Sequence, residues 1–256
     1  MSERASSFLI LGCGYTGARV AARLAARGER VIAESRDPAK LQPLGVETVR
    51  FGEALPIAPG TRVLHSLPIP YAVNIQGASR LVYLSTTGVY GDQLEVNETT
   101  PVAPRNAREQ SRVDEERAVA AACANHLILR PAAIYGPGRG VHISLLEGKH
   151  RYWGEGTNYI SRIHVEDLAA LTEAALLSDL TGAYPVADDE PARAIDITRF
   201  CCELLGLPVP PPQAGEPGED TRRANRRVDG RAIRRALRVN LVFPSYRLGI
   251  PAALAR

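Results

Sequence analysis

A run of apolar residues ends in a group of hydroxyl side chains within LVYLSTTGVYGD, residues 81–92. Ser85 and Thr86 carry hydroxyl groups that donate and accept hydrogen bonds, and the phenol of Tyr90 can also transfer a proton. These groups follow the apolar run at the point where a buried strand would meet water. Two interpretations stay open: the hydroxyls take part in binding or catalysis, or they satisfy backbone groups of the loop that follows the strand.

A glycine-rich stretch near the start of the chain has the spacing of a phosphate-binding turn. Gly12, Gly14 and Gly17 spell G-x-G-x-x-G directly after the apolar run SFLIL and directly before the helical pattern ARVAARLAARG. The glycines allow a tight turn and let a pyrophosphate approach the N-terminus of the helix. The alternative is a glycine turn in a fold that has lost its cofactor. The context predicts a dinucleotide site.

The end of the next strand, RVIAESR, indicates which dinucleotide binds. An acidic residue there accepts the ribose hydroxyls of NAD, whereas an arginine suits the 2′-phosphate of NADP. Ser35 can donate to a phosphate and Arg36 can clamp it. By alternation along a strand, Glu34 shares a face with Arg36 and its carboxylate would oppose the phosphate. The pattern favours NADP and leaves NAD possible.

These groups must be positioned by alternating strands and helices. Strands are expected at SFLIL, RVIAESR, ETVRF, TRVLHSL, RLVYLST and HLILRPAAIYG, with helices after the glycines, from Asp37-Pro38, at 109–124, at about 166–178 and near 195–205. The alternation predicts an α/β fold with a parallel sheet. Between Ser66 and Arg80 lie about 13 residues, with Pro68 and Pro70 among them. Either the crossover helix there is cut down, or a stretch is absent from the chain.

Composition argues against several classes of protein. The 256 residues carry a net charge of +3, too mild to demand nucleic acid, and the four cysteines have no metal-like spacing. No apolar run reaches the length of about 20 residues that spans a bilayer, and the N-terminal residues do not resemble a signal peptide. We therefore expect a cytoplasmic monomer or homodimer with no metal, no membrane and no nucleic acid as partners.

An arginine-rich segment lies near the C-terminus, with eight arginines within residues 222–238. A solvated basic helix is the default interpretation. One or two of these arginines, Arg227 among them, could instead bind an anionic substrate such as a nucleotide sugar. Nucleic-acid binding is disfavoured because aromatic residues are not interleaved with the arginines.

Four ordered motifs, GCGYTG, LVYLSTTGVYGD, LRPAAIYGPGR and RIHVEDLA, give the chain a family resemblance. It resembles an extended short-chain dehydrogenase/reductase of the NAD-dependent epimerase/dehydratase family over nearly its whole length. The closing RRANRRVDGRAIRRALRV and FPSYR are similar to the atypical YeeZ-like subgroup. The resemblance implies a Rossmann-type doubly wound sheet with a small C-terminal substrate lobe. The Rossmann domain would comprise residues 1–138, completed by about 160–188, and the lobe residues 139–159 and 189–256.

The chain departs from that family at its acid/base pair, Tyr-x-x-x-Lys. Aligning SRVDEERAV with the family's helix places Arg108 and Arg112 at the two positions, and none of the nine tyrosines has a lysine four residues on. Arginine stays protonated, so it cannot replace the tyrosine. The pair lies on one helix face. It belongs either to a surface helix screened by neighbouring acids or to a site that holds an anion.

Motifs and resemblance together predict three sets of site residues. The catalytic set is Ser85, Thr86 and Tyr90; the cofactor set is Gly12, Gly14, Tyr15, Thr16, Gly17, Ser35, Arg36, Ser66, Leu67, Ser85 and Arg112; the substrate set is Arg108, Tyr135 and Arg227. The leading function is an oxidoreductase or epimerase-like enzyme that uses NADP, or NAD, on an unidentified anionic small molecule. The alternative is a dinucleotide-binding regulator or sensor without turnover, so enzymatic activity stays open.

Overall fold

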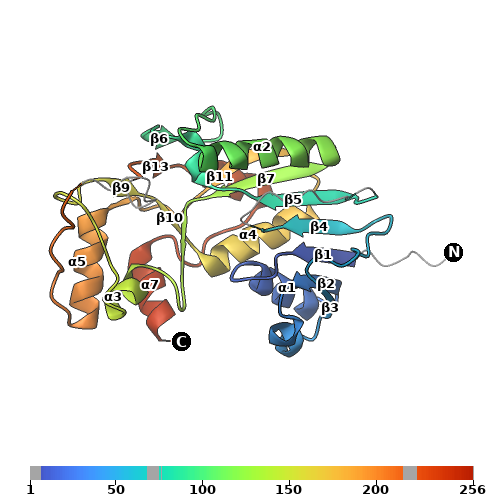
Figure 1. The fold of residues 1–256 in the computed structure, drawn as a ribbon, viewed down its shortest axis with the longest axis horizontal. Helices are drawn as coiled ribbons and strands as arrows, with labels where there is room; N and C mark the ends of the chain where they lie inside the picture. The colour runs from blue at the N-terminus through green and yellow to red at the C-terminus, as the bar shows by residue number, and fades with distance from the viewer. Residues whose placement is uncertain (1–6, 68–74, 76, 216–223, 256) are drawn as a thin grey trace.

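A seven-stranded parallel sheet forms the centre of the computed structural model, which describes residues 7–67, 75, 77–215 and 224–255 (Figure 1). Its order is β11-β7-β5-β4-β1-β2-β3. The strands are β1 (Ser7–Leu11), β2 (Arg30–Ser35), β3 (Glu47–Arg50), β4 (Arg62–His65), β5 (Arg80–Leu84), β7 (His126–Pro131) and β11 (Gly182–Val186). The order reverses between β1 and β4, which is the point where such sheets bind ligands beyond the carboxyl ends of their strands. The predicted Rossmann-type fold is confirmed.

Helices cover both faces of the sheet because side chains alternate along each strand. Phe8 and Ile10 of β1 pack with α1 (Gly17–Ala26) and α4 (Val165–Leu177). Leu9 and Leu11 face the opposite side, where α2 (Ala107–Ala122) lies (Figure 1). Both faces are buried, so the strands read as continuous apolar runs rather than alternating ones.

On the face of the sheet that α2 covers, the segments that connect β3 to β4 and β4 to β5 contain no helix among the described residues. Leu55 and Ile57, from the segment between β3 and β4, pack directly against that face, and so does Ile75. The expected shortening around Pro68 and Pro70 falls on residues 68–74, outside the described part of the chain. After β2, the helix predicted from Asp37-Pro38 is a 3-10 helix, η1 (Pro38–Leu44). Pro43 inside η1 has no N–H for a continuing α-helix, which limits the element to this length.

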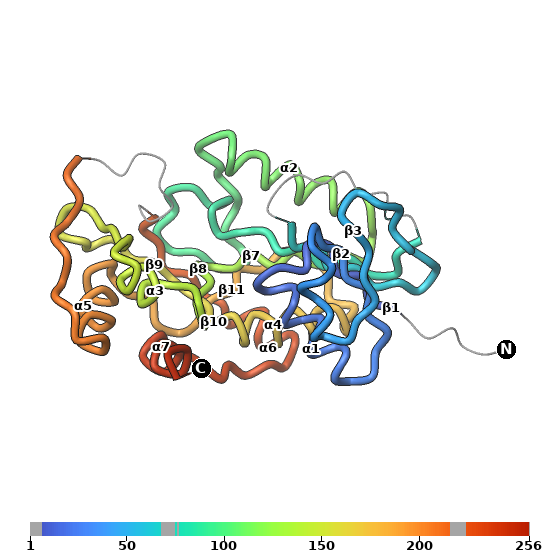
Figure 2. The backbone as a smooth tube through the Cα atoms, turned by 60° about the horizontal axis from the view of Figure 1, so that its bottom comes forward, coloured from blue at the N-terminus to red at the C-terminus, as the bar shows by residue number. Residues whose placement is uncertain are grey.

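A smaller lobe lies at one end of the molecule. Figure 2 shows α3 (Val141–Leu146), α5 (Ala194–Leu205) and α7 (Tyr246–Leu254) grouped there, away from β1, β2 and β3. Its core includes Tyr135, Ile197, Cys201, Tyr246 and Ile250.

The remaining elements are η2 (Thr87–Tyr90), β6 (Glu95–Val96), β8 (Ala133–Tyr135), β9 (Tyr159–Ile160), β10 (Arg162–His164), β12 (Ala192–Arg193), β13 (Arg227–Val228) and α6 (Arg231–Leu237). The residue limits proposed for the two parts stay a prediction.

The RIHVEDLA segment joins the sheet to the C-terminal region. His164 accepts a hydrogen bond from the backbone N–H of Glu166 at 3.3 Å and begins α4. The carboxylate of Asp167 accepts backbone hydrogen bonds from Val242 at 2.8 Å and Phe243 at 2.9 Å. Asp167 therefore anchors the chain that leads into α7. Within the described part of the chain, none of the helices has the length and apolar character that crossing a membrane requires.

Candidate functional site

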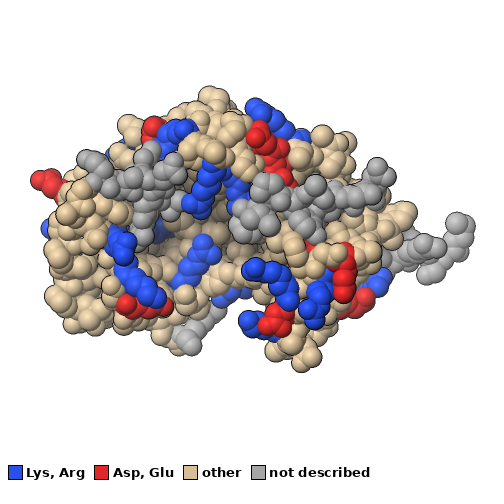
Figure 3. Space-filling view, viewed as in Figure 1, with Lys and Arg blue, Asp and Glu red and all other residues tan. Residues whose placement is uncertain are grey.

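A cavity of about 1500 Å³ opens at the carboxyl ends of the sheet strands and extends to the small lobe. The glycine-rich loop, the tips of β2, β4 and β5, the N-terminal turns of α2 and the segment after β8 line it, together with residues of the lobe. Figure 3 shows the hollow with basic side chains around it. Ligand pockets usually occupy about 300–1000 Å³. This cavity can therefore hold a dinucleotide together with a small molecule.

The three glycines of the loop serve different purposes. Gly12 has φ +78°, and a Cβ there would lie 2.7 Å from Cδ2 of Leu67. A Cβ on Gly17 would lie 2.9 Å from the carbonyl oxygen of Gly12. Gly14 differs, because its nearest neighbour would be 4.0 Å away. The protein itself requires the first and third glycines, whereas Gly14 leaves open space at the cavity wall for a ligand to approach.

The start of α1 is arranged to receive an anion. Its N-cap residue, Thr16, makes no side-chain capping hydrogen bond, and the first turn contains no acidic residue. The first backbone N–H groups of a helix have no partner within the helix, and the helix dipole favours negative charge there. The hydroxyl of Ser66 contacts the carbonyl oxygens of Leu11 and Gly12 at 3.0 and 2.7 Å and holds the loop in place.

Tyr15 ties the glycine-rich loop to the segment that follows β8. Its hydroxyl donates a hydrogen bond to the carbonyl of Pro137 at 3.0 Å. The guanidinium groups of Arg19 and Arg139 lie 4.3 and 5.4 Å from the centre of its ring. Burial raises the pKa of the phenol. Tyr15 therefore acts as part of the cavity wall.

The tip of β2 separates the acidic and basic residues that the sequence places together. Glu34 is fully buried within the strand, whereas Arg36 lies beyond the end of the strand and is exposed. The alternation used to place both on one face ends with the strand at Ser35. The Ser35 hydroxyl accepts a hydrogen bond from the backbone N–H of Asp37 at 3.0 Å and keeps its own hydrogen for a ligand.

Two buried charged residues, Glu116 and Arg130, bind the hydroxyls of Ser85 and Tyr90 after β5. Ser85 donates a 2.5 Å hydrogen bond to Glu116, and Arg130 binds both oxygens of that carboxylate at 2.7 and 3.0 Å. Arg130 also donates to the hydroxyl of Tyr90 at 3.1 Å. Tyr90 is fully buried, is not among the residues that line the cavity, and has its pKa raised by burial. The structure therefore does not bring the predicted catalytic Tyr90 to the site.

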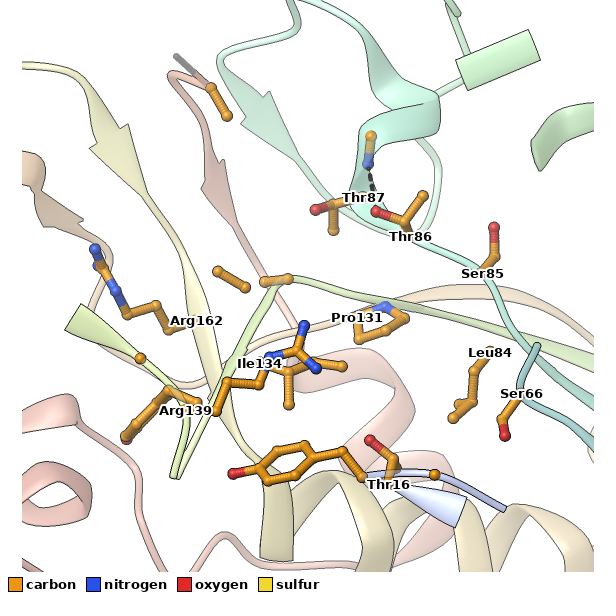
Figure 4. A pocket seen from close by; sticks show the side chains of 18 of the residues that line it. Thr16, Ser66, Leu84, Ser85, Thr86, Thr87, Pro131, Ile134, Arg139 and Arg162 are labelled. Atoms are coloured by element: carbon orange, nitrogen blue, oxygen red, sulfur yellow. Dashed lines mark hydrogen bonds between the residues drawn. The ribbon is translucent and has the colours of Figure 1, made fainter. Parts of the chain in front are cut away.

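Ser85 and Thr86 both reach the cavity wall, with complementary hydrogen-bonding capacity. The hydrogen of Ser85 is committed to Glu116, so its lone pairs remain for a ligand. Thr86 accepts from the backbone N–H of Gly88 at 3.1 Å, as the dashed line in Figure 4 shows, and its O–H remains free to donate. The strand tip presents one acceptor and one donor.

Among the described residues, Arg108 and Arg112 of α2 form no ion pair with the acids of the same helix. Arg112 donates to the hydroxyl of Tyr83 at 2.8 Å and to the carbonyl of Leu67 at 3.2 Å, and Arg108 is exposed; both line the cavity. The neighbouring acids have other partners: Glu109 binds Arg105, Glu115 binds His65, Glu116 binds Arg130, and Asp114 binds Arg117. The screened-helix interpretation therefore lacks the contacts it needs among the described residues.

The predicted substrate residues are placed differently from one another. Arg108 and Tyr135 line the cavity, but the Tyr135 hydroxyl is packed where a Cβ on Gly249 would touch it at 2.2 Å. Burial raises the Tyr135 pKa strongly. Arg227 is not among the lining residues, because it binds Glu95 at 2.7 Å and stacks on Tyr159.

Arg226, one residue earlier, takes the place in the wall that was predicted for Arg227. It is buried, lines the cavity, and donates to the backbone carbonyls of Thr87 and Gly91. Arg226 directly precedes β13 and forms an isolated bridge with Ile160. Successive residues of an extended segment point to opposite sides, and the sequence does not show which side of this one faces inward.

The cavity wall is strongly basic. Of the lining side chains that the structure describes, nine are Lys or Arg and three are Asp or Glu. Sequence reasoning missed Arg139, His150, Arg151, Arg162 and Arg226 as lining residues. One signal was available for Arg162, which interrupts the apolar pattern of a strand. The described residues contain no cluster of His, Cys, Asp or Glu that could hold a metal ion.

Comparisons with known proteins agree with this architecture. Residues 60–186 match the model of the NAD dependent epimerase/dehydratase family. A functionally unknown conserved protein from Silicibacter pomeroyi is 32% identical over 98% of both chains, with a TM-score of 0.84. A structure titled as a putative NAD-dependent epimerase/dehydratase, from Methylobacillus flagellatus, is 26% identical over 98% of both chains, with a TM-score of 0.75.

More distant similarities extend to proteins with named activities. A UDP-glucuronic acid 4-epimerase from Bacillus cereus, solved with NAD, shares the fold at 17% identity over 97% of both chains, with a TM-score of 0.77. A Streptomyces protein named 3-diazoavenalumate denitrifying reductase is 36% identical over 101 residues, which are 37% of this chain and 33% of that protein. The chain thus spans about a third of the length of this relative. From its fold, its glycine-rich loop and these matches, the chain belongs to the NAD-dependent epimerase/dehydratase family.

Proposed function

We propose that the chain binds NADP(H), with NAD(H) as the weaker ligand, and acts as an oxidoreductase or epimerase-like enzyme on an anionic small molecule. The observation that carries this proposal is the basic cavity that runs without interruption from the glycine-rich loop to the small lobe. One end supplies backbone N–H groups for a pyrophosphate, and the other supplies room and positive charge for a second anion.

The residues around the loop fit a dinucleotide. Gly14 presents open backbone to the cavity, and the N-terminus of α1 lies beside it. Ser66 and Leu67 support the loop from the tip of β4. When bound, the cofactor supplies the hydride chemistry that amino-acid side chains lack. The protein's part is to bind it, orient it and exclude water.

The tip of β2 supports NADP over NAD. Arg36 is exposed at the cavity and forms no ion pair with any described residue, and the Ser35 hydroxyl can donate. A phosphate placed between them would receive charge-assisted hydrogen bonds. The buried carboxylate of Glu34 lies within the strand, so the exposed group at the tip is the arginine. This arrangement matches a 2′-phosphate better than two ribose hydroxyls.

The excess of basic over acidic side chains in the wall supports an anionic substrate. The Bacillus cereus epimerase is named for a nucleotide sugar, and the Streptomyces relative is named as a reductase. A nucleotide sugar is an anion and so agrees with a basic cavity. Epimerisation and reduction both agree with redox use of a nicotinamide cofactor. We take from these names the reaction class, redox or redox-assisted epimerisation, and not the substrate itself.

In this proposal, positively charged side chains and hydrogen-bonding hydroxyls bind and stabilise the substrate in the absence of the Tyr-x-x-x-Lys pair. Arg108 and Arg112 stabilise negative charge that develops on a substrate oxygen, as fixed positive groups beside a reacting centre do. Thr86 donates a hydrogen bond to the ligand, and Ser85 accepts one. None of these groups transfers a proton near neutral pH, so a substrate group or water completes proton transfer.

One observation favours the alternative of a sensor without turnover. Among the described residues, three tyrosines line the cavity, and each phenol is occupied or buried: Tyr15 donates to Pro137, Tyr152 donates to Pro210, and Tyr135 packs against Gly249. A protein that needs to bind a dinucleotide without reacting would lose nothing by this arrangement.

Turnover separates the two candidates. Protein loaded with NADPH is mixed with pools of small carboxylates, sugar phosphates and nucleotide sugars, and the absorbance of the reduced nicotinamide is followed. An oxidoreductase changes this absorbance catalytically with at least one pool. An epimerase returns the hydride to its substrate and leaves the absorbance unchanged, so each pool is also analysed for new stereoisomers, and the Gly14→Ala variant should give neither signal. Cofactor binding without a change in absorbance or a new isomer in any pool, with either cofactor form, would support the sensor and contradict the enzyme.

A further inference from the structure

The small-lobe end of the cavity contains a buried arginine that the cofactor proposal does not use. Arg162, in β10, is 4% exposed and lines the cavity. Its Nη1 atom donates to the carbonyl of Ile160 at 2.7 Å. Among the described residues, it has no second hydrogen-bond acceptor and no carboxylate at salt-bridge distance. Most of its five N–H donors are therefore unused.

A buried guanidinium without an ion-pair partner is unfavourable for the fold. Burial lowers the pKa of Arg162 to about 10, so the group still carries its charge at neutral pH. Desolvating such a charge is unfavourable unless an anion compensates it. Arginine at a cavity wall offers a planar fork that matches the two oxygens of a carboxylate or phosphate.

Asp188 is the carboxyl group that acts on Arg162, and it does not form an ion pair with it. The Asp188 carboxyl is 2% exposed and accepts a hydrogen bond from the backbone N–H of Glu190 at 3.3 Å. Burial raises the pKa of this carboxyl to about 8, which disfavours the charged form that would compensate Arg162. The positive charge of Arg162 remains available to a ligand.

The position of Arg162 sets it apart from the cofactor end. β10 pairs with β8 so that Arg162 lies opposite Ala133, another lining residue. Figure 4 shows Arg162 on the side of the pocket away from Leu84 and Ser66, which belong to the sheet end. A dinucleotide held at the glycine-rich loop has its phosphates at that opposite end.

Arg226 provides a contrast at the same wall. It is also buried and lines the cavity, but both of its Nη atoms donate to backbone carbonyls, those of Thr87 and Gly91. Arg226 therefore joins the turn after β5 to the lobe. Arg162, with one backbone contact, has the donors that a ligand needs.

We propose that Arg162 is the anion-binding residue of a substrate subsite at the small-lobe end of the cavity, where it binds a carboxylate or phosphate group of the substrate. This inference rests on the proposed function, because it assigns the cofactor to the opposite end. It names the group that selects substrates: a molecule that carries an oxyanion at the end remote from its reacting carbon.

The test uses inorganic phosphate and acetate as probes of the two oxyanion classes, titrated calorimetrically into protein saturated with NADP⁺. Wild type is expected to bind at least one of them, and the anion that binds identifies the class. The Arg162→Met variant should bind it about 10- to 100-fold more weakly, as the loss of a charge-assisted bidentate contact implies. The Arg227→Met variant, which changes an exposed arginine outside the cavity, should bind it as wild type does.

A second measurement separates ligand binding from a structural role. The double variant Arg162→Met, Asp188→Asn removes both buried ionisable groups, and its melting temperature should equal or exceed that of wild type, because no buried charge is left unpaired. A clear fall in melting temperature, with anion affinity unchanged, would show that Arg162 is structural and would overturn the proposal. Failure of wild type to bind either probe would also overturn it.

The two proposals fail in different ways. If wild type does not bind NADP⁺, the proposed function fails, and titration of the cofactor-free protein still tests Arg162. If NADP⁺ binds equally to wild type and to Arg162→Met, while both proteins bind the anion alike, only the subsite is wrong.

Discussion

The hydroxyl of Ser85, at the tip of β5, donates a hydrogen bond of 2.5 Å to the carboxylate of Glu116, two turns into α2. Arg130 of the neighbouring strand β7 holds the same carboxylate with two further hydrogen bonds. One carboxylate thus joins two strands and a helix below the cavity floor. It also fixes the direction of the Ser85 hydrogen, which sets what this hydroxyl offers to a ligand.

The first prediction concerns that carboxylate. Glu116→Gln removes the charge that compensates buried Arg130, and the side chains of the pair are 7% and 11% exposed. Breaking one partner of a buried ion pair typically costs about 3 to 5 kcal/mol. We expect the free energy of unfolding in urea to fall by this amount. Asp114→Asn on the same helix, whose partner Arg117 is exposed, should change it by less than about 1 kcal/mol. Equal effects of both changes would contradict the account.

The second prediction separates the glycines of the loop. Gly14→Ala adds a Cβ with no protein atom closer than 4.0 Å, so the free energy of unfolding should stay unchanged while NADPH affinity is lost. Gly17→Ala places a Cβ 2.9 Å from the Gly12 carbonyl, which should destabilise the fold by about 1 to 3 kcal/mol. Chemical unfolding and calorimetry of both variants test this. Normal NADPH binding by a folded Gly14→Ala protein would refute the proposed phosphate site.

The third prediction concerns the choice of cofactor. Arg36→Asp replaces a free guanidinium with a carboxylate at the tip of β2, where the 2′-phosphate is expected. NADPH should bind more weakly by about 1.5 to 3 kcal/mol, the contribution of hydrogen bonds to a charged group, and NADH should be spared. Calorimetric titration with the two cofactors measures the difference. Wild-type protein that binds both with equal affinity would remove the role given to Arg36.

The fourth prediction is a pH dependence of stability at Asp188, whose pKa burial raises from 3.8 to about 8. The folded state keeps a proton that the unfolded state releases, so this contribution is full below pH 3.8 and is lost as pH rises toward 8. Wild type should therefore lose stability relative to Asp188→Asn over this window, by up to about 1.4 kcal/mol per pH unit. Urea unfolding of both proteins at several pH values tests the slope. Parallel curves would mean that Asp188 is ionised in the fold.

The fold was predictable because its signals are local. The glycine spacing, the apolar runs and the helical stretch that became α2 depend on neighbouring residues, and the structure has all of them. The strand predicted as HLILRPAAIYG divides into β7 and β8, which pair with different partners, β11 and β10. Such a division depends on which distant strand is adjacent, and the sequence alone does not show this.

The sequence predicts those site residues whose position follows from the ends of the parallel strands. It does not predict those whose side-chain direction depends on which side becomes buried. Gly12, Gly14, Ser66, Ser85 and Thr86 all line the cavity, because strand tips of a parallel sheet meet at one edge. Tyr90, predicted for the catalytic set, does not line the cavity, because Arg130 holds its hydroxyl in the interior. Arg226, which directly precedes the two-residue strand β13, lines the cavity in place of Arg227 and donates to the carbonyls of Thr87 and Gly91. Both outcomes depend on tertiary contacts that no local pattern encodes.

We propose that this basic cavity binds a phosphorylated dinucleotide at the glycine-rich loop. The decisive measurement is calorimetric titration of the wild-type chain with NADPH and with NADH. We expect saturable binding of one NADPH per chain, tighter than that of NADH and abolished by Gly14→Ala. No binding of either cofactor, in reduced or oxidised form, would contradict it.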